Sequence, residues 1–286
     1  MKSIFFILIS VTNFNVFSQI QDTPWKKNIS EREFIPYQEV REVDVFWSKR
    51  LWQIIDTREK QNLIFINPQL SLIEILHTAA MNGEIKAYDN SVINGDQFKI
   101  ELNKEQISSI GRSRDTIYDE FLAESLLVES NETNSNVNSN NTLCHACVVI
   151  ENEFDFSSVK RFKIKEDWFF NSATSTMEVR IVGIAPLMEV YDDYGNYLGD
   201  ETLYWLYYPE LRPILAKYEA YNTGNFAQRL SWDDIFVARY FSSYIYKEDN
   251  VYDRPIQQYA AGKDVLYESE RIKQMIFNFE HDLWSY

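Results

Sequence analysis

The chain has 286 residues, of which 45% are hydrophobic and 15% aromatic, with 18 Tyr, 19 Phe and 7 Trp. It carries 28 Lys and Arg against 43 Asp and Glu, which gives a formal net charge of −15. This composition is typical of a globular protein. It disfavours nucleic acid and anionic membrane surfaces as partners, because like charges repel. A basic protein partner suits the charge better, unless the charge serves solubility alone.

The N-terminus has the three parts of a secretory signal peptide. Lys2 supplies a positive charge, residues 4–11 are apolar, and Val16-Phe17-Ser18 ends in a small residue. The apolar run is too short for a permanent membrane span, and no later run is longer, so we expect no direct membrane insertion. No Cys stands near the expected cleavage site, so we expect no lipid anchor there. The sequence therefore predicts signal peptide 1–18 and an exported chain beginning near Gln19.

The next segments read as an arm followed by two helices. Residues 19–42 mix Pro, Lys and Glu without a period and predict an extended N-terminal arm. A helix beginning at Asp44 is predicted from the i, i+4, i+7, i+8 spacing of Trp47, Leu51, Ile54 and Ile55. A second helix, following Pro68, is predicted from the shared face of Leu72, Ile73, Leu76 and Ala80. Asn82-Gly83 is a typical helix end, since Gly readily adopts the left-handed conformation.

Low complexity marks the middle of the chain, where residues 130–142 are rich in Asn and Ser and predict a flexible linker or loop. Strands are predicted for residues 161–168 and 176–191. The turn residues 192–196 separate Met188–Tyr191 from the aromatic run 203–208, which indicates a hairpin.

Helical patterns return in the last third of the chain. One helix is predicted from Leu211, Ile214, Leu215 and Tyr218, with its end at Thr223-Gly224. Ser231 has the sequence context of a capping box. A C-terminal amphipathic helix is predicted from Ile272, Met275, Ile276, Phe279 and Leu283.

The two parts of the chain also echo each other. Six positions line up with residues 141 positions later, the first pair being Pro68 and Pro209 and the last being Ile85 and Phe226. Asn103 corresponds to Ser231, with insertions shifting the offset. We therefore predict an α+β fold with two related strand–helix halves, although a chance match of short helix signals would give the same pattern. The expected units are residues 43–129, the linker 130–147, and residues 148–286 with the C-terminal helix.

Cys144-His145-Ala146-Cys147 is the one segment whose residues could form a reactive or metal-binding site. A CxxC can be a redox pair, a local disulfide or half of a zinc site. It follows the Asn-rich tract rather than a strand of a βαβ unit, and a second zinc-ligand pair is missing. We favour a local Cys144–Cys147 disulfide, and expect no metal, no cofactor and no catalytic residue. A thiol- or metal-dependent enzyme centred on Cys144, His145 and Cys147 stays open as an alternative.

Clusters of Trp, Tyr and Arg are the stronger signal, since these residue types dominate protein–protein hot spots. The predicted interface residues are Trp47, Arg50, Trp52, Asp56, Arg58, Glu59, Trp205, Tyr207, Tyr208, Glu210, Arg212, Trp232, Tyr252 and Arg254. Each of them alone could equally be a core or solvated side chain. A peptidoglycan-binding module is a further alternative, favoured by the aromatic content.

Several of these strings resemble one family. They are VFWSKRLWQIIDTREKQN at 45–62, LYWLYYPELRPIL at 203–215, LSWDDIF at 230–236, SERIK at 269–273 and FEHDLW at 279–284. In this order they resemble the gliding-motility GldN (PorN) family, from about Val43 to the C-terminus. The Asn-rich tract and the CHAC segment depart from that pattern.

The resemblance implies a non-enzymatic structural component of the type IX secretion system of Bacteroidetes. Members of that family lie in the periplasm and form rings with an outer-membrane lipoprotein, GldK (PorK). They are thought to connect these rings to the motor proteins GldL and GldM (PorM). The expected partners are therefore a GldK-like lipoprotein, the periplasmic part of a GldM-like protein, and further copies of this chain.

Overall fold

The computed structural model describes residues 32–67, 71–91, 95–112, 114–118, 147–151, 154–192, 194–221 and 229–283. Helices and antiparallel strands occur together, so the fold is α+β, as predicted. The predicted signal peptide, the Asn-rich tract and Cys144 lie outside the described residues, as does Trp284 near the C-terminus.

The strands are β1 (Val45–Asp56), β2 (Ala87–Tyr88), β3 (Arg114–Tyr118), β4 (Cys147–Glu151), β5 (Val159–Asn171), β6 (Thr176–Tyr191), β7 (Tyr197–Thr202), β8 (Trp205–Tyr207), β9 (Glu219–Ala220), β10 (Leu230–Ser231) and β11 (Tyr244–Glu248). The helices are α1 (Leu72–Asn82), α2 (Lys104–Ser109), α4 (Tyr208–Leu215), α5 (Trp232–Val237) and α6 (Asp264–Leu283). Short 3₁₀ helices are η2 (Glu42–Asp44), η3 (Lys60–Ile66), η4 (Gly95–Gln97), η5 (Phe156–Ser158) and η6 (Ile256–Gln258).

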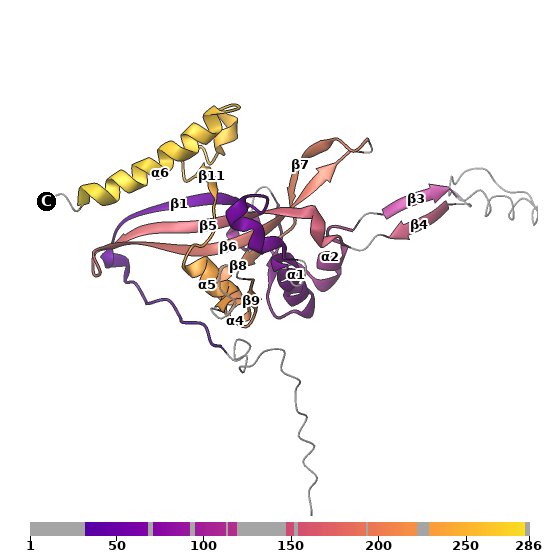
Figure 1. Cartoon of the computed structure of the whole chain (residues 1–286), viewed down its shortest axis with the longest axis horizontal. Helices are drawn as coiled ribbons and strands as arrows, with labels where there is room; N and C mark the ends of the chain where they lie inside the picture. The colour runs from indigo at the N-terminus through magenta and orange to yellow at the C-terminus, as the bar shows by residue number, and fades with distance from the viewer. Residues whose placement is uncertain are drawn as a thin grey trace, which may run out of the picture.

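The centre of the molecule is a seven-stranded antiparallel sheet in the order β11-β1-β5-β6-β8-β2, with β7 also paired to β6. β1 and β2 precede the Asn-rich tract, and the other strands follow it, so both predicted halves contribute to this sheet. Figure 1 shows α6 beside β11 and β1, while α1, α2, α4 and α5 gather near β6 and β8. β3 and β4 form a separate two-stranded ribbon.

Three hydrophobic clusters hold these elements together. The largest joins α1, α4 and α5 to the sheet through residues such as Leu76, Ile164, Ile184 and Leu211. A second, smaller cluster fixes α6, with Ile272 and Ile276 against Leu51 and Ile245. A third surrounds Trp52 and Trp205. The sheet thus carries two separate helical packing layers, one large and one small.

The helix predicted from Asp44 is wrong, because these residues form β1. Along Val45–Arg50 the side chains alternate between more and less exposed, as a strand requires. From Leu51 to Ile55 both faces are buried, because Leu51 packs against Ile272 and Ile276 of α6 while Trp52, on the opposite face, packs in the Trp205 cluster. A strand buried on both faces loses its alternation, and its apolar residues then match a helical spacing by accident.

The second predicted helix is confirmed as α1. The Ser71 hydroxyl accepts a hydrogen bond from the Glu74 amide at 3.3 Å and so caps its N-terminus. Gly83 ends the helix in the left-handed region with φ of 75°, where a Cβ would be strained.

The two predicted strands after the linker are confirmed as β5 and β6, and the turn after them is where expected. The Asp192 carboxylate accepts the amides of Tyr194 at 3.0 Å and Asn196 at 2.7 Å, an Asx-type turn. The hairpin partner differs from the prediction. Tight closure pairs β6 with β7, whereas part of the run 203–208 forms β8, opposite Gly183 and Ile184 further along β6.

The last third is confirmed with one change of length. α4 ends at Leu215, so Tyr218 lies beyond it and the helix does not extend toward Thr223, which is itself outside the described residues. The backbone amides of Lys217 and Tyr218 donate hydrogen bonds to the carbonyls of Ile214 and Leu215, closing the last turn in 3₁₀ geometry.

The predicted capping box at Ser231 is confirmed, because Ser231 Oγ accepts the Asp234 amide at 3.1 Å. The C-terminal helix is confirmed as α6, with Ile272 and Ile276 buried. Asn103 is the N-cap residue of α2, as Ser231 is of α5. In both helices the side chain three residues later, Gln106 or Asp234, accepts a hydrogen bond from the backbone amide of the N-cap residue. The duplication of the two halves stays a prediction.

Candidate interaction surfaces

The structure places part of the predicted interface in the protein interior. Side chains with at most 5% of their surface exposed are Trp52, Trp205, Tyr208, Arg212 and Trp232. They pack within the folded chain in this conformation, and their contact with a partner stays a prediction. Large rings with a polar tip suit a core as well as an interface, which is why the sequence alone could not separate the two.

The remaining predicted interface residues are exposed or half-buried: Trp47, Arg50, Asp56, Arg58, Glu59, Tyr207, Glu210, Tyr252 and Arg254. They do not form one patch. Arg50 bonds Asp167 on β5 through Nε at 2.5 Å and Nη2 at 2.7 Å. The Arg254 guanidinium lies 4.8 Å from the Tyr252 ring centroid, in the turn after β11. For these residues the interface role stays a prediction.

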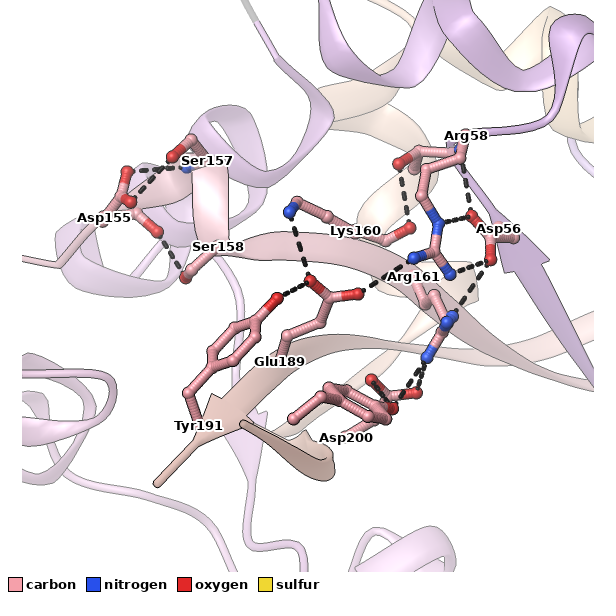
Figure 2. Close-up of polar contacts among 12 residues, drawn as sticks. Asp56, Arg58, Asp155, Ser157, Ser158, Lys160, Arg161, Glu189, Tyr191 and Asp200 are labelled. Atoms are coloured by element: carbon pink, nitrogen blue, oxygen red, sulfur yellow. Dashed lines mark hydrogen bonds and ion pairs between the residues drawn. The ribbon is translucent and has the colours of Figure 1, made fainter. Parts of the chain in front are cut away.

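Asp56 and Arg58 belong to an ionic network where β1, β5, β6 and β7 meet (Figure 2). We define this network as Asp56, Arg58, Lys160, Arg161, Glu189, Tyr191, Tyr197 and Asp200. The Asp56 carboxylate accepts hydrogen bonds from Arg58 Nε at 2.9 Å and Nη2 at 2.6 Å, and from Arg161 Nε at 3.1 Å. Asp56 and Arg161 are direct partners in the β1–β5 register, so strand pairing itself brings them together.

Glu189 is the most buried acid of the network, with 5% of its side chain exposed. It accepts the Tyr191 hydroxyl at 2.7 Å and pairs with Lys160 Nζ at 3.1 Å and Arg58 Nη1 at 3.2 Å. A buried carboxylate is costly unless it is paired and hydrogen-bonded, and these three partners meet that requirement.

Arg161 links β5 to β7. Its Nη1 donates to the Tyr197 hydroxyl at 3.0 Å and to the Asp200 carboxylate. Tyr197 in turn donates to the second Asp200 oxygen at 2.8 Å. The Arg161 side chain therefore joins Asp56 at the end of β1 to the strand that follows the β6–β7 turn.

The network balances its charges, with the carboxylates Asp56, Glu189 and Asp200 against the cations Arg58, Lys160 and Arg161. Burial by itself would raise the pKa of Asp56, but hydrogen bonds from Arg58 and Arg161 hold that pKa well below its ordinary value. Burial likewise opposes the lowered pKa of Glu189, which hydrogen bonds from Tyr191 and Lys160 produce. Both acids therefore stay ionised at neutral pH, and the arrangement is a stiff ionic base rather than a proton-transfer pair.

Exposed aromatic side chains stand next to this base on the β6–β7 hairpin, which projects from the body of the molecule (Figure 1). Tyr194 at the turn is 90% exposed, Leu198 is 68% exposed, and Tyr191 and Tyr197 are each half-exposed. The Tyr191 and Tyr197 rings lie 6.0 Å apart, edge to face. A ring whose hydroxyl is already fixed loses little freedom on binding, so this hairpin is a suitable protein-binding surface.

The buried Arg212 fixes a second region, the end of the N-terminal arm. Arg212 Nε and Nη2 bond the Asp233 carboxylate at 2.9 and 3.1 Å, and the Tyr208 hydroxyl donates to the same carboxylate at 3.1 Å. Nη2 also donates to the Ile35 carbonyl at 2.7 Å. The Tyr37 ring lies 4.1 Å from the Arg212 guanidinium, and burial raises the pKa of its hydroxyl. The Arg212 side chain therefore holds the chain's own N-terminal arm against the folded body.

Sequence reasoning missed Lys160, Arg161, Glu189, Tyr191, Tyr197 and Asp200. A signal was present, because Arg161 and Glu189 are charged residues within predicted strands, where polar side chains need partners. The turn at 192–196 also places Tyr191 close to Tyr197 once it is closed. Tyr37 carried no comparable signal, since its partners lie more than 140 positions away.

Among the described residues, no group of His, Cys, Asp and Glu is arranged to hold a metal ion. Within the same part of the chain, no helix has both the length and the apolar character that a membrane span requires. A family model described as gliding motility associated protein GldN matches residues 40–285. The chain belongs to the GldN family. That match takes in every described element from η2 to α6, and it confirms the resemblance inferred from the aromatic strings. A comparison with curated proteins finds no match.

Proposed function

We propose that this gliding-motility component is a non-enzymatic structural subunit of the type IX secretion system. It acts in the periplasm, where it builds a ring with further copies of itself and a GldK-like outer-membrane lipoprotein. The ring connects to the periplasmic part of a GldM-like motor protein. The subunit uses no cofactor in this role.

One observation supports the proposal above the others: the β6–β7 hairpin presents exposed tyrosines on a charge-balanced base. Tyr194 and Leu198 are exposed, while Glu189 and Arg161 below them are fully paired. Such a surface can bind another protein without first reorganising, and binding without reorganisation loses less free energy. A rigid hairpin of this kind suits a subunit that must hold several neighbours in fixed orientations.

The test is co-purification of the exported chain with the GldK-like lipoprotein, followed by sizing. We expect the double variant Tyr194→Ser and Leu198→Ser to lose at least tenfold in lipoprotein binding. Both side chains are exposed, so its unfolding midpoint should stay within the error of the unchanged chain. Unchanged binding would remove the hairpin from the proposal, and no binding by the unaltered chain would contradict the function itself.

Two matched controls accompany this experiment. Tyr267→Ser replaces a tyrosine that is 71% exposed on α6, away from the hairpin, and should bind as the unaltered chain does. Cys144→Ser with Cys147→Ser should also bind normally. A loss of the machine's activity in that cysteine variant, with binding intact, would favour the thiol alternative.

A further inference from the structure

The end of the N-terminal arm is bound as a peptide ligand would be. Within residues 32–40, Phe34, Tyr37 and Val40 are half-buried, and their neighbours are exposed. This period of three is that of a polyproline II helix, and Pro36 lies between the two aromatic residues. The arm therefore turns one residue in three toward the folded body.

Arg212 and Arg180 bind this segment through hydrogen bonds and ring stacking. Arg212 Nη2 donates to the Ile35 carbonyl at 2.7 Å, and Arg180 Nη2 donates to the Gln38 carbonyl at 2.6 Å. The Tyr37 ring centroid lies 4.1 Å from the Arg212 guanidinium and 5.1 Å from that of Arg180. Carbonyl capping with ring stacking is a mode of recognition that needs no β-pairing.

The arm contacts the body through a few separate side-chain contacts rather than through strand pairing. No backbone–backbone hydrogen bond joins residues 32–40 to the rest of the described chain. Tyr37 lines two cavities, one of about 670 Å³ over β1, β5 and β6 and one of about 810 Å³ against α5. The chain leaves this groove through Arg41–Asp44, a short 3₁₀ turn in which Val43 is 81% exposed.

The groove borders an unpaired part of β6. On the edge of β6 away from β5, Thr176–Val182 pairs with no described strand, and the arm reaches this stretch at Arg180. An uncovered strand edge invites unwanted pairing. An arm seated in the groove therefore lies beside an edge of β6 that no described strand pairs.

We propose that this groove accepts residues 32–40 from a second copy of the chain, so that neighbouring copies exchange their arms. The proposal rests on the self-assembly in the proposed function. The segment that fits the groove is the chain's own N-terminal arm. Exchange keeps both arginine contacts and both ring contacts, and only the exposed turn at Arg41–Asp44 must open. Once neighbours lie side by side, the high local concentration of their arms favours the exchange.

The experiment is light scattering of the exported chain, of Phe34→Ala with Tyr37→Ala, and of Arg180→Gln. The Phe34→Ala, Tyr37→Ala variant has a defective arm and an intact groove, whereas Arg180→Gln has an intact arm and a defective groove. We expect the unaltered chain to form assemblies of several copies and each variant alone to be largely monomeric. When the two variants are mixed, intact arms meet intact grooves, and a heterodimer should form. Ile35→Ser is the matched arm control, because the groove binds the Ile35 carbonyl and its side chain is 81% exposed.

The outcomes separate this inference from the proposed function. Assemblies that persist in the arm variant overturn the exchange, as do mixed variants that stay monomeric. An unaltered chain that remains monomeric yet binds the GldK-like lipoprotein also overturns the exchange and leaves the function standing. Unfolding midpoints of the variants near that of the unaltered chain exclude misfolding as the cause.

Discussion

The base of the β6–β7 hairpin and the Arg212 site use the same kinds of side chain in different surroundings. Both join arginines, carboxylates and tyrosines. In the hairpin base most of the paired ions are partly exposed: Asp56, Arg161 and Asp200 each keep 16% of their side chains exposed, although Glu189 keeps 5%. At the Arg212 site the two charged side chains keep 4% and 7%.

The fold depends more on the charges at the Arg212 site than on those of the hairpin base. In the hairpin base, water can partly replace a lost partner, and every ion except Lys160 has a second partner within the network. Arg212 and Asp233 have little water and depend on each other. An isolated charge left in the interior is costly, whereas an exposed pair contributes little. We therefore expect substitutions at the Arg212 site to change stability most.

The largest expected effect comes from Arg212→Met, which keeps the apolar length but leaves Asp233 unpaired in the interior. We expect the free energy of unfolding to fall by about 3–5 kcal/mol, because breaking one side of a buried pair leaves an uncompensated charge. Urea unfolding followed by tryptophan fluorescence measures it. Arg212→Met with Asp233→Leu is the matched control and should recover much of the loss. A single variant as stable as the unaltered chain would show that water reaches Asp233.

A smaller effect is expected from Arg161→Met in the hairpin base. It removes hydrogen bonds to Asp56, Asp200 and Tyr197, but Arg58 still holds Asp56, and Tyr197 still bonds Asp200. We expect a loss of about 1–2 kcal/mol, toward the low end of the contribution of hydrogen bonds to charged groups, because this site is partly exposed. Arg50→Met serves as the control, because it breaks a single more exposed pair and should cost less. Equal losses at Arg161 and Arg212 would erase the distinction between the two regions.

How far the sequence predicts this molecule depends on whether the signal is local. α1, the turn after β6 and the cap at Ser231 could be predicted, because each depends on residues within a few positions of one another. β1 could not, since its burial on both faces depends on α6 and on Trp205, which come more than 100 residues later. The same holds for Tyr37, whose partners Arg180 and Arg212 become neighbours only in the folded chain. The family resemblance was accessible early because its strings are long and ungapped.

The smallest expected effect is a change in pH dependence at Asp56. Its pKa is lowered in the folded state, so its stabilising contribution is complete above the unfolded value near 4. That contribution is lost as the pH falls from about 4 toward the lower folded pKa, because the unfolded chain then takes up the proton first. Asp56→Asn should therefore cost about 1 kcal/mol at neutral pH, because solvent screens this partly exposed site and because Arg58 and Arg161 keep their partners Glu189 and Asp200. Its stability should fall less steeply than that of the unaltered chain between about pH 4 and pH 2.

Urea midpoints measured from pH 7 down to pH 2 check this expectation, with Asp253→Asn as the control. Asp253 also pairs with a cation, Lys247, but its side chain is 77% exposed, and its removal should leave the acid slope almost unchanged. If Asp56→Asn kept the full acid slope, the ionisation of Asp56 would not contribute to stability. The hairpin base would then be held by its neutral hydrogen bonds and by strand pairing, and its tyrosines would owe their position to the β6–β7 register alone.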